Sequence, residues 1–261
     1  MVATTTYLIT GASSGIGLEL ARQLAAVDGN RVYATVRKRG SSLTGEDAVS
    51  RIEPAAGSTV TIVEGVDVAS DAVGDVLVPQ LEGQAMDVVV HNAGSLSGTR
   101  DIVDAGNPMA EQKLESVSAD RMRAAFEVNA LGPLRVQQAL LGAGLMAEGG
   151  KVAVISTGFG SIGDNTSGGT YAYRASKAAV NMIAKGMSCD LKERGMAVRC
   201  IAPGFVATEF GPGKEKMTAW GAMPVETSCR GILALIDSMT VDNTGEFHCV
   251  QRDGSAKAMS W

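Results

Sequence analysis

The feature that most constrains the fold of this chain is a repeated alternation of short apolar runs with helical patterns. Stretches with helical spacing lie between most of the runs, such as GLELARQLAAV after the first run and KAAVNMIAKGMSCDLKERG after the fifth. A strand, helix, strand order favours a parallel sheet with helices on both faces. We therefore predict an α/β fold with about seven strands. The strands are expected at 7–10, 31–36, 59–64, 87–92, 151–156, 197–202 and 246–250.

Residues 1–261 are predicted to form a single domain, because no Pro- or Ser-rich linker, internal repeat or low-complexity tract divides them. Two irregular stretches, 95–117 and 207–224, are expected to be binding loops. The second follows the sixth expected strand, at the sheet edge where such folds bind ligands. Its surroundings are rich in large apolar side chains, which favour an apolar ligand unless they pack the loop against the body. They are Phe205, Phe210, Met217, Trp220 and Met223.

The overall composition favours a soluble protein with a small-molecule partner. The hydrophobic content of 45% allows a substantial core, and the net charge of −5 argues against a nucleic-acid surface. The first residues, MVATTTYLIT, lack the pattern of a secretory signal, and no segment approaches the roughly 18 apolar residues of a membrane span. We expect a cytoplasmic protein that does not enter a membrane.

The cysteines and histidines do not predict a metal site, because the cysteines are far apart and form no CxxC pair. We interpret the cysteines as small core residues with reduced thiols. The residues concerned are Cys189, Cys200, Cys229, Cys249, His91 and His248.

A glycine-rich segment, TGASSGIG, follows the first expected strand and opens a helical pattern. Gly11, Gly15 and Gly17 have the spacing G-x-x-x-G-x-G, which is looser than the G-x-G-x-x-G fingerprint. Such a turn allows backbone N–H groups and a helix N-terminus to approach a pyrophosphate, because glycine has no Cβ. The alternative is a tight turn between strand and helix with no ligand.

The second expected strand ends in a basic run, Arg37-Lys38-Arg39, where NAD-binding proteins of this architecture have a carboxylate for the ribose 2′-OH. An arginine can pair bidentately with the 2′-phosphate of NADP. The run therefore favours NADP over NAD, with a solvated basic turn as the alternative.

Tyr173 and Lys177 stand at i and i+4, so they share one face of the helix expected there. A neighbouring ammonium favours phenolate, which predicts a lowered pKa for Tyr173 and suits it to proton transfer. Tyr171 falls off this face and is expected to precede the helix.

Together these motifs resemble the short-chain dehydrogenase/reductase family. The resemblance rests on TGASSGIG, Asp67-Val68, His91-Asn92-Ala93-Gly94, Asn129, Tyr173-x-x-x-Lys177 and Pro203-Gly204, in the family's order across residues 10–208. Within the family, 128–134, 163–181 and the final TGEF...W are similar to the C-factor and sniffer-type carbonyl reductase branch. The resemblance implies one Rossmann-like, doubly wound domain with a dinucleotide lying across the strand ends.

The resemblance also implies roles for individual residues. Lys177 would hold the nicotinamide ribose and tune Tyr173, and Asn129 would support a water relay toward that lysine. The phosphates of the dinucleotide would contact Gly11, Ser13, Ser14, Gly15, Ile16 and Gly17. The adenine would contact Asp67 and Val68, and the ribose would contact Asn92, Ala93 and Gly94. The nicotinamide would contact Pro203, Gly204, Val206 and Thr208.

Two positions depart from the family pattern. His91 stands where the family has the first Asn of NNAG, and we expect a local effect only. The catalytic serine is replaced, because the register from the fifth strand to YAYRASK puts Thr157 in its place. Threonine keeps the hydroxyl donor, although its side chain is stiffer. Ser156 is the fallback, but alternation along a strand would point it the other way.

The implied activity is NADPH-dependent reduction of a carbonyl compound, or oxidation of the alcohol, with Tyr173 as the proton donor or acceptor and Thr157 binding the developing oxyanion. One alternative is a dinucleotide-binding signalling protein with little turnover, and another is an epimerase or dehydratase, for which the region after Thr208 is short.

Relatives pair through the helices that carry Asn129 and Tyr173, so a homodimer or homotetramer is possible, with a monomer as the alternative.

Overall fold

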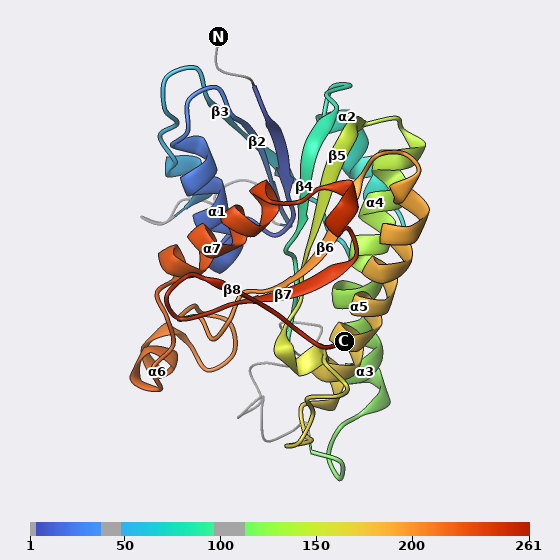
Figure 1. Cartoon of the computed structure of the whole chain (residues 1–261), viewed down its shortest axis with the longest axis vertical. Coiled ribbons are helices and arrows are strands. Elements are labelled where there is room, and N and C mark those ends of the chain that lie inside the picture. The colour runs from blue at the N-terminus through green and yellow to red at the C-terminus, as the bar shows by residue number, and fades with distance from the viewer. Residues whose placement is uncertain (1–3, 38–47, 97–112) are drawn as a thin grey trace.

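A computed structural model describes residues 4–37, 48–96 and 113–261. Within these residues the centre is an eight-stranded sheet of order β3-β2-β1-β4-β5-β6-β7-β8, in which only the β7–β8 pair is antiparallel. The predicted α/β fold with a doubly wound parallel sheet is confirmed (Figure 1). The strands are β1 Thr6–Ile9, β2 Arg31–Val36, β3 Thr59–Glu64, β4 Met86–His91, β5 Met146–Ile155, β6 Ala197–Ala202, β7 Glu246–Val250 and β8 Ala256–Ala258.

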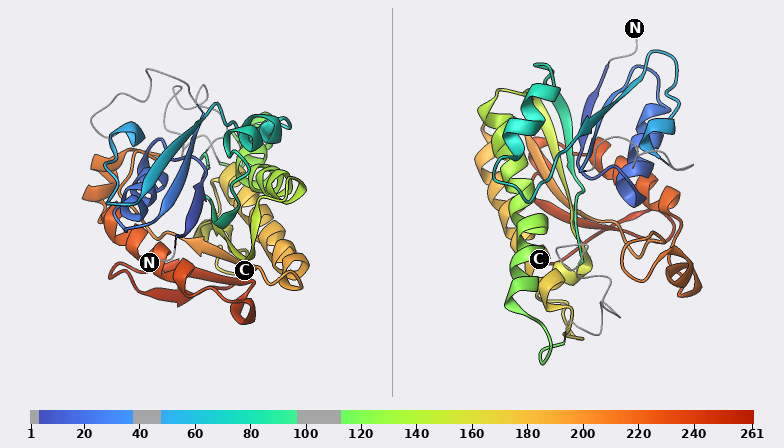
Figure 2. Two further views of the ribbon diagram at one scale, coloured as in Figure 1. Left: turned by 90° about the horizontal axis from the view of Figure 1, so that it is seen from above. Right: turned by 180° about the vertical axis from the view of Figure 1, so that it is seen from behind.

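Helices cover both faces of the sheet, as the two views in Figure 2 show. One hydrophobic cluster joins the sheet to α1 and α7, and the other joins it to α2, α4 and α5. Neighbouring strand residues alternate between these clusters, as Val88, Val89 and Val90 do, because side chains along a strand point to opposite faces. The helices are α1 Gly15–Ala25, α2 Val73–Gln80, α3 Ala119–Phe126, α4 Gly132–Gly142, α5 Tyr171–Lys192, α6 Lys214–Ala219 and α7 Val225–Asp237.

The strand predictions differ from the structure mainly at β5 and β8. The bounds of β2, β3, β6 and β7 are as predicted, whereas β5 begins at Met146 rather than at 151. Its early part includes Gly149, with φ of 71°, and the β4–β5 register shifts between Met86 and Val88. That irregular stretch hides the strand pattern, since two glycines interrupt it. The short antiparallel β8 was not predicted.

The helix predictions need one correction. α5 begins at Tyr171, so the expectation that Tyr171 precedes the helix is wrong. Thr170 is the N-cap residue of this helix and has a left-handed backbone conformation, with φ of 49°. Tyr171 is thus the first helical residue, two positions before Tyr173.

The loops that follow β1, β4, β5 and β6 meet at the carboxyl edge of the sheet, which is the lower edge in Figure 1. Most of the expected loop 95–117 lies outside the described residues. The stretch 207–224 contains α6 and is closed at its base by an isolated bridge between Val206 and Met223.

The structure also tests the interpretation of the cysteines as core residues. Cys200 and Cys229 are buried, Cys249 is half-buried and Cys189 is exposed, so the interpretation of all four as core residues is wrong for Cys189. In this part of the chain no group of three or more His, Cys, Asp or Glu side chains could hold a metal ion. No helix described here has the length and apolar character needed to cross a membrane.

Candidate active site

The glycine turn between β1 and α1 is packed so closely that side chains do not fit. Gly11 has φ of 69°, and a Cβ there would lie 2.9 Å from Cα of Ala93. A Cβ on Gly17 would collide with Nδ2 of Asn92 and with the carbonyl oxygen of Gly11. The turn therefore needs glycine at both positions, because other residues would force the two loops apart.

Asn92 ties the loop after β4 to the glycine turn. Its Nδ2 donates to the carbonyl oxygens of Thr10 at 2.9 Å and Gly11 at 3.1 Å. The Thr10 hydroxyl oxygen accepts from the backbone N–H groups of Asn92 and Ala93, each at 3.0 Å. Both hydrogens of the Asn92 amide are thus engaged by backbone, and its side chain holds the turn rather than reaching outward.

The start of α1 leaves room and donors for a phosphate group. Ser14 occupies the N-cap position, but its side chain makes no capping hydrogen bond, and the first turn has no acidic residue. Ser13 and Ser14 are exposed, and a Cβ on Gly15 would lie 3.6 Å from Thr208 of the loop after β6. Free N–H groups and the positive end of the helix dipole suit an anion here, so the residues fit a dinucleotide pyrophosphate.

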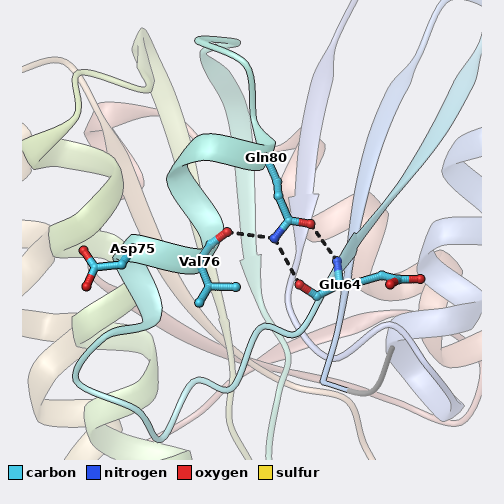
Figure 3. A pocket seen from close by; sticks show the side chains of 4 residues that line it. All are labelled: Glu64, Asp75, Val76 and Gln80. Atoms are coloured by element: carbon cyan, nitrogen blue, oxygen red, sulfur yellow. Dashed lines mark hydrogen bonds between the residues drawn. The ribbon is translucent and has the colours of Figure 1, made fainter. Parts of the chain in front are cut away.

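The adenine side of the predicted site is held by Gln80 of α2. Its amide makes two hydrogen bonds of 3.0 Å to the backbone of Glu64, one to the N–H and one to the carbonyl oxygen (Figure 3). This fixes the end of β3 and the chain that leads to Asp67. The Asp67 carboxylate accepts from the N–H of Ala69 at 3.0 Å, and Val68 is buried.

Arg37 follows β2, next to the end of β3 in the sheet, and its side chain is exposed. It is therefore free to reach a ligand at this edge. Lys38 and Arg39, which complete the basic run, lie outside the described residues.

Tyr173 and Thr157 are brought together by a hydrogen bond between their side chains. Burial raises the pKa of Tyr173 far above its usual range, and the bond with Thr157 acts in the opposite direction. The expectation of a lowered pKa for Tyr173 is therefore wrong in this structure. The physical reason is that the cost of burying a phenolate exceeds the other contributions.

The Lys177 ammonium lies over the Tyr173 ring. Its Nζ donates to the carbonyl oxygen of Ile155 at 2.8 Å and lies 5.9 Å from the centroid of the Tyr173 ring. Burial lowers the pKa of Lys177 to about 8, and the neighbouring Cys200 acts in the opposite direction. The lysine can therefore change its protonation state near neutral pH.

The two adjacent hydroxyls at the end of β5 point to different partners. Thr157 bonds to Tyr173 and accepts from the N–H of Phe159 at 3.2 Å. Ser156 is buried and donates to Oδ1 of Asn181 at 2.5 Å. Alternation along the strand thus aims Thr157, and not Ser156, at the tyrosine.

Asn129 lies in a π-helical turn, Glu127–Leu131, between α3 and α4. Such widened turns are frequent at functional sites, because they displace side chains from the regular helix. The Asn129 Nδ2 donates to the carbonyl oxygen of Ser95 at 2.7 Å and to the Ser176 hydroxyl at 3.0 Å, while its Oδ1 accepts from the Ser95 N–H at 2.8 Å.

The backbone of Gly94 brings Asn129 and Lys177 to one place. A Cβ on Gly94 would lie 3.3 Å from Oδ1 of Asn129 and 3.7 Å from Nζ of Lys177. Ser95 and Ser176 were missed by the sequence analysis as parts of this cluster. Ser176 stands inside the Tyr173-to-Lys177 motif, so its position was the available signal.

His91 is not part of this cluster. Its Nε2 pairs with Oε1 of Gln137 on α4 at 3.1 Å, and the side chain is buried. Burial lowers the pKa of His91 to about 4, so the ring is neutral at physiological pH. The departure from the family pattern therefore has a local effect, as expected.

The loop after β6 crosses the carboxyl edge of the sheet. Gly204 has φ of 84°, and a Cβ there would lie 2.6 Å from the carbonyl oxygen of Val250. Further along, the Phe210 ring lies 5.8 Å from that of Tyr173, and a Cβ on Gly211 would lie 3.9 Å from Leu96. Pro203, Gly204, Val206 and Thr208 thus belong to a segment that reaches both the glycine turn and the tyrosine.

The apolar residues of this loop divide into two groups. Met223 is buried against the body of the protein, which is the packing role. Phe205, Phe210 and Trp220 are 43%, 39% and 63% exposed, and Phe210 is in ring contact with Tyr173. Phe210 is therefore the aromatic residue that the structure places beside the candidate acid.

The glycine turn at a helix start and the paired tyrosine and threonine beside a buried lysine have the chemistry expected of a nicotinamide-dependent oxidoreductase. The chain belongs to the short chain dehydrogenase family, whose model matches residues 5–219. It is 34% identical to 1-hydroxy-2-glutathionyl-2-methyl-3-butene dehydrogenase of Rhodococcus sp. (strain AD45), over 93% of this chain and 95% of that protein.

A second relative matches about half of this chain, and a solved structure matches its full length. The chain is 40% identical to C-signal of Myxococcus xanthus over 126 residues, which are 48% of this chain and 72% of that protein. Among solved structures, an NADPH-bound carbonyl reductase from chicken fatty liver is similar with a TM-score of 0.76 at 24% identity, and the alignment covers 100% of both chains.

Proposed function

We propose that this chain is an NADPH-dependent carbonyl reductase in which Tyr173 transfers a proton to the carbonyl oxygen. The observation that carries the proposal is the hydrogen bond between Tyr173 and Thr157 beside the buried ammonium of Lys177. A nicotinamide dinucleotide, when bound, supplies the hydride. The glycine turn, the uncapped start of α1 and the exposed Arg37 are the residues that would hold it.

The phenol of Tyr173 is held in its protonated form. Because burial raises its pKa, the hydroxyl keeps its proton throughout the physiological pH range. It is therefore a proton donor in carbonyl reduction, and it recovers the proton in the reverse oxidation. The same residues serve both directions.

The Thr157 hydroxyl is suited to stabilise the developing oxyanion. It accepts one hydrogen bond from the Phe159 N–H, so its own hydrogen is available to the tyrosine or to a substrate oxygen. A donor held in place before the reaction stabilises charge where the charge appears.

Lys177 and Asn129 are suited to replace the proton that Tyr173 loses. Lys177, whose pKa is about 8, can release a proton near neutral pH. The backbone of Gly94 lies beside both Nζ of Lys177 and Oδ1 of Asn129, which would complete a path through water. We propose this relay for the reprotonation of the tyrosine.

The substrate is proposed to be an apolar carbonyl compound or the corresponding alcohol. Phe210 covers the Tyr173 ring and gives the site one apolar wall. The relative from Rhodococcus, by its name, acts on the hydroxyl of a glutathione conjugate, so an alcohol with a large substituent is a second candidate for this chain.

The proposal includes a cytoplasmic location and pairing of two copies through the helices near Asn129 and α5. Light scattering of the purified protein checks the pairing. A mass of twice 26.9 kDa would support the pairing, and a mass of 26.9 kDa would contradict it.

The experiment that tests the function measures NADPH oxidation with a panel of aldehydes and ketones. Tyr173→Phe should lower kcat by about 10²-fold or more, because it removes the proton donor. Tyr171→Phe is the matched control, since it removes a second phenol two positions away on the same helix and should retain far more activity. Wild-type turnover by Tyr173→Phe would contradict the assignment.

A signalling function is the second candidate, and the similarity to C-signal over about half of this chain favours it. Binding alone does not require a tyrosine, a lysine and an asparagine in the arrangement described above. Tight NADPH binding without turnover of any compound in the panel would support the signalling function against the reductase.

A further inference from the structure

We propose that the segment Met259–Trp261 is a positioning element for the hydroxyl of Thr157. This segment packs against the outer side of the turn Thr157–Ser161, while α5 packs against its inner side. The inference rests on the proposed reductase function, and it adds residues that lie more than eighty positions away from the tyrosine in the sequence.

The inner side of the turn is fixed by α5. A Cβ on Gly160 would lie 3.0 Å from the carbonyl carbon of Lys177 and 3.1 Å from Nδ2 of Asn181. The same Nδ2 donates to the carbonyl oxygen of Gly160 at 3.4 Å, and the Oδ1 of Asn181 accepts from Ser156. The turn therefore has little room to move toward the helix, because there is no space even for a Cβ between Gly160 and the Lys177 backbone.

The outer side of the turn is covered by Met259 and Trp261. A Cβ on Gly158 would lie 3.4 Å from Cε of Met259. The hydroxyl of Ser161, which is 1% exposed, lies 3.3 Å from the main-chain oxygen of Trp261 and donates to it or to the Asp164 carboxylate at 3.1 Å. The turn is thus held between the helix and this segment.

The segment itself is anchored on β7. The N–H of Met259 donates to the carbonyl oxygen of Phe247 at 2.8 Å, and the Trp261 ring lies 5.4 Å from the Phe247 ring. Lys185 of α5 places its ammonium 5.8 Å from the centroid of the Trp261 ring, within the range of a cation–π contact. The Trp261 ring therefore anchors the segment on β7 and α5, while the main-chain oxygen of Trp261 meets the turn at Ser161.

The orientation of Thr157 depends on this turn. Thr157 has an extended backbone, and its hydroxyl oxygen accepts from the N–H of Phe159, which belongs to the turn. A turn free on its outer side would let this hydrogen bond and the one with Tyr173 fluctuate. Misplacement of a catalytic group by about 1 Å can cost about 10²-fold in rate, so the outer contact bears directly on kcat.

The test is a double-mutant cycle between Trp261 and Thr157, measured as NADPH-dependent carbonyl reduction. Trp261→Ala should lower kcat on the order of tenfold with the KM for NADPH unchanged, and Trp261→Phe should restore most of the rate. In a Thr157→Val background, the same Trp261→Ala change should alter kcat by less than about twofold, because the hydroxyl that it positions is already gone. Met259→Ala should show the same pattern in smaller measure. Val27→Ala is the control, since it removes an apolar side chain that is 54% exposed, in the segment after α1 and outside the helices proposed to pair.

Hydrogen exchange gives a second readout that does not need activity. Amides of 157–164 should exchange on the order of tenfold faster in Trp261→Ala than in the wild type. Amides of β3 in Trp261→Ala, and amides of 157–164 in Val27→Ala, should exchange as in the wild type. Equal losses of kcat in both backgrounds, or unchanged exchange at 157–164, would overturn the proposal. A wild-type protein that reduces no carbonyl would refute the proposed function, and the exchange comparison would still decide whether the segment holds the turn.

Discussion

The ring of Phe210 lies 5.8 Å from the ring of Tyr173 at an angle of 51°, so a residue of the loop after β6 covers the candidate acid on α5. This contact contributes to the burial that raises the pKa of Tyr173. The loop therefore bears on the protonation of the tyrosine.

Phe210→Ala should move the alkaline limit of carbonyl reduction to lower pH. Reduction needs the protonated phenol, and exposure to water lowers the pKa of Tyr173 toward its ordinary value near 10.0. We expect the alkaline limit in the profile of kcat/KM to fall in Phe210→Ala and to move less in Phe205→Ala, because the ring contact with Tyr173 is made by Phe210. An unchanged alkaline limit in Phe210→Ala would show that the ring does not control the burial of the phenol.

Thr157→Val should lower kcat by about 10²-fold, because valine keeps the shape but loses the hydroxyl beside Tyr173. Thr157→Ser should keep most of the rate. Ser156→Ala is the matched change next in the chain, and it should cost stability of about 1–3 kcal/mol by leaving Oδ1 of Asn181 without this donor. Steady-state kinetics and urea unfolding separate the two effects. A larger kinetic loss in Ser156→Ala than in Thr157→Val would reverse the assignment.

Lys177→Met should flatten the pH dependence of stability between about pH 8 and 10.5. The pKa of Lys177 is lowered from 10.5 to about 8 by burial, so between these values the unfolded chain binds the proton more strongly than the folded protein. The lysine therefore makes the free energy of unfolding rise with pH across this window, and it contributes a constant penalty below pH 8. The difference between wild type and Lys177→Met in denaturant unfolding at several pH values isolates this contribution. No difference in slope would mean that the folded lysine titrates as the unfolded one does.

The sequence predicted the sheet well where each strand is a continuous apolar run bordered by polar residues, as in β2 and β6. It failed at the start of β5, where glycines break the pattern, and at β8, which is short and exposed. In both places the strand forms because it pairs with a neighbouring strand, and the residues that pair are distant in the sequence.

For the site, the motifs predicted which residues gather, and alternation along β5 predicted that Thr157 and Ser156 diverge. The sign of the pKa shift of Tyr173 was not predictable, because it depends on how deeply the loop after β6 and α5 bury the phenol. The cluster of Asn129 with Ser95 and Ser176 depends likewise on the π-helical turn, for which the sequence has no periodic signal.

Gly17→Ala should weaken NADPH binding by roughly tenfold to a hundredfold. The added methyl group would collide with the Asn92 amide and the Gly11 carbonyl oxygen, which together hold the turn for the phosphates. Gly142→Ala is the control, because a Cβ at that helical position of α4 has nothing within 4 Å. Fluorescence titration with NADPH gives the two values of Kd. Equal binding by the two variants would show that the glycine turn does not hold the dinucleotide.

Arg37→Ala should raise the KM for NADPH far more than the KM for NADH. The exposed guanidinium stands at the end of β2, where the ribose 2′-phosphate is expected, and a charge-assisted contact of this kind contributes about 1.5–3 kcal/mol, or roughly tenfold to a hundredfold. Arg31→Ala is the matched control, because Arg31 is an exposed arginine at the opposite end of the same strand. Kinetics with both cofactors over a range of ionic strength measure the effect, which should shrink as salt screens the charge. Equal changes for the two cofactors would identify Arg37 as a solvated surface residue and would remove the ground for preferring NADP.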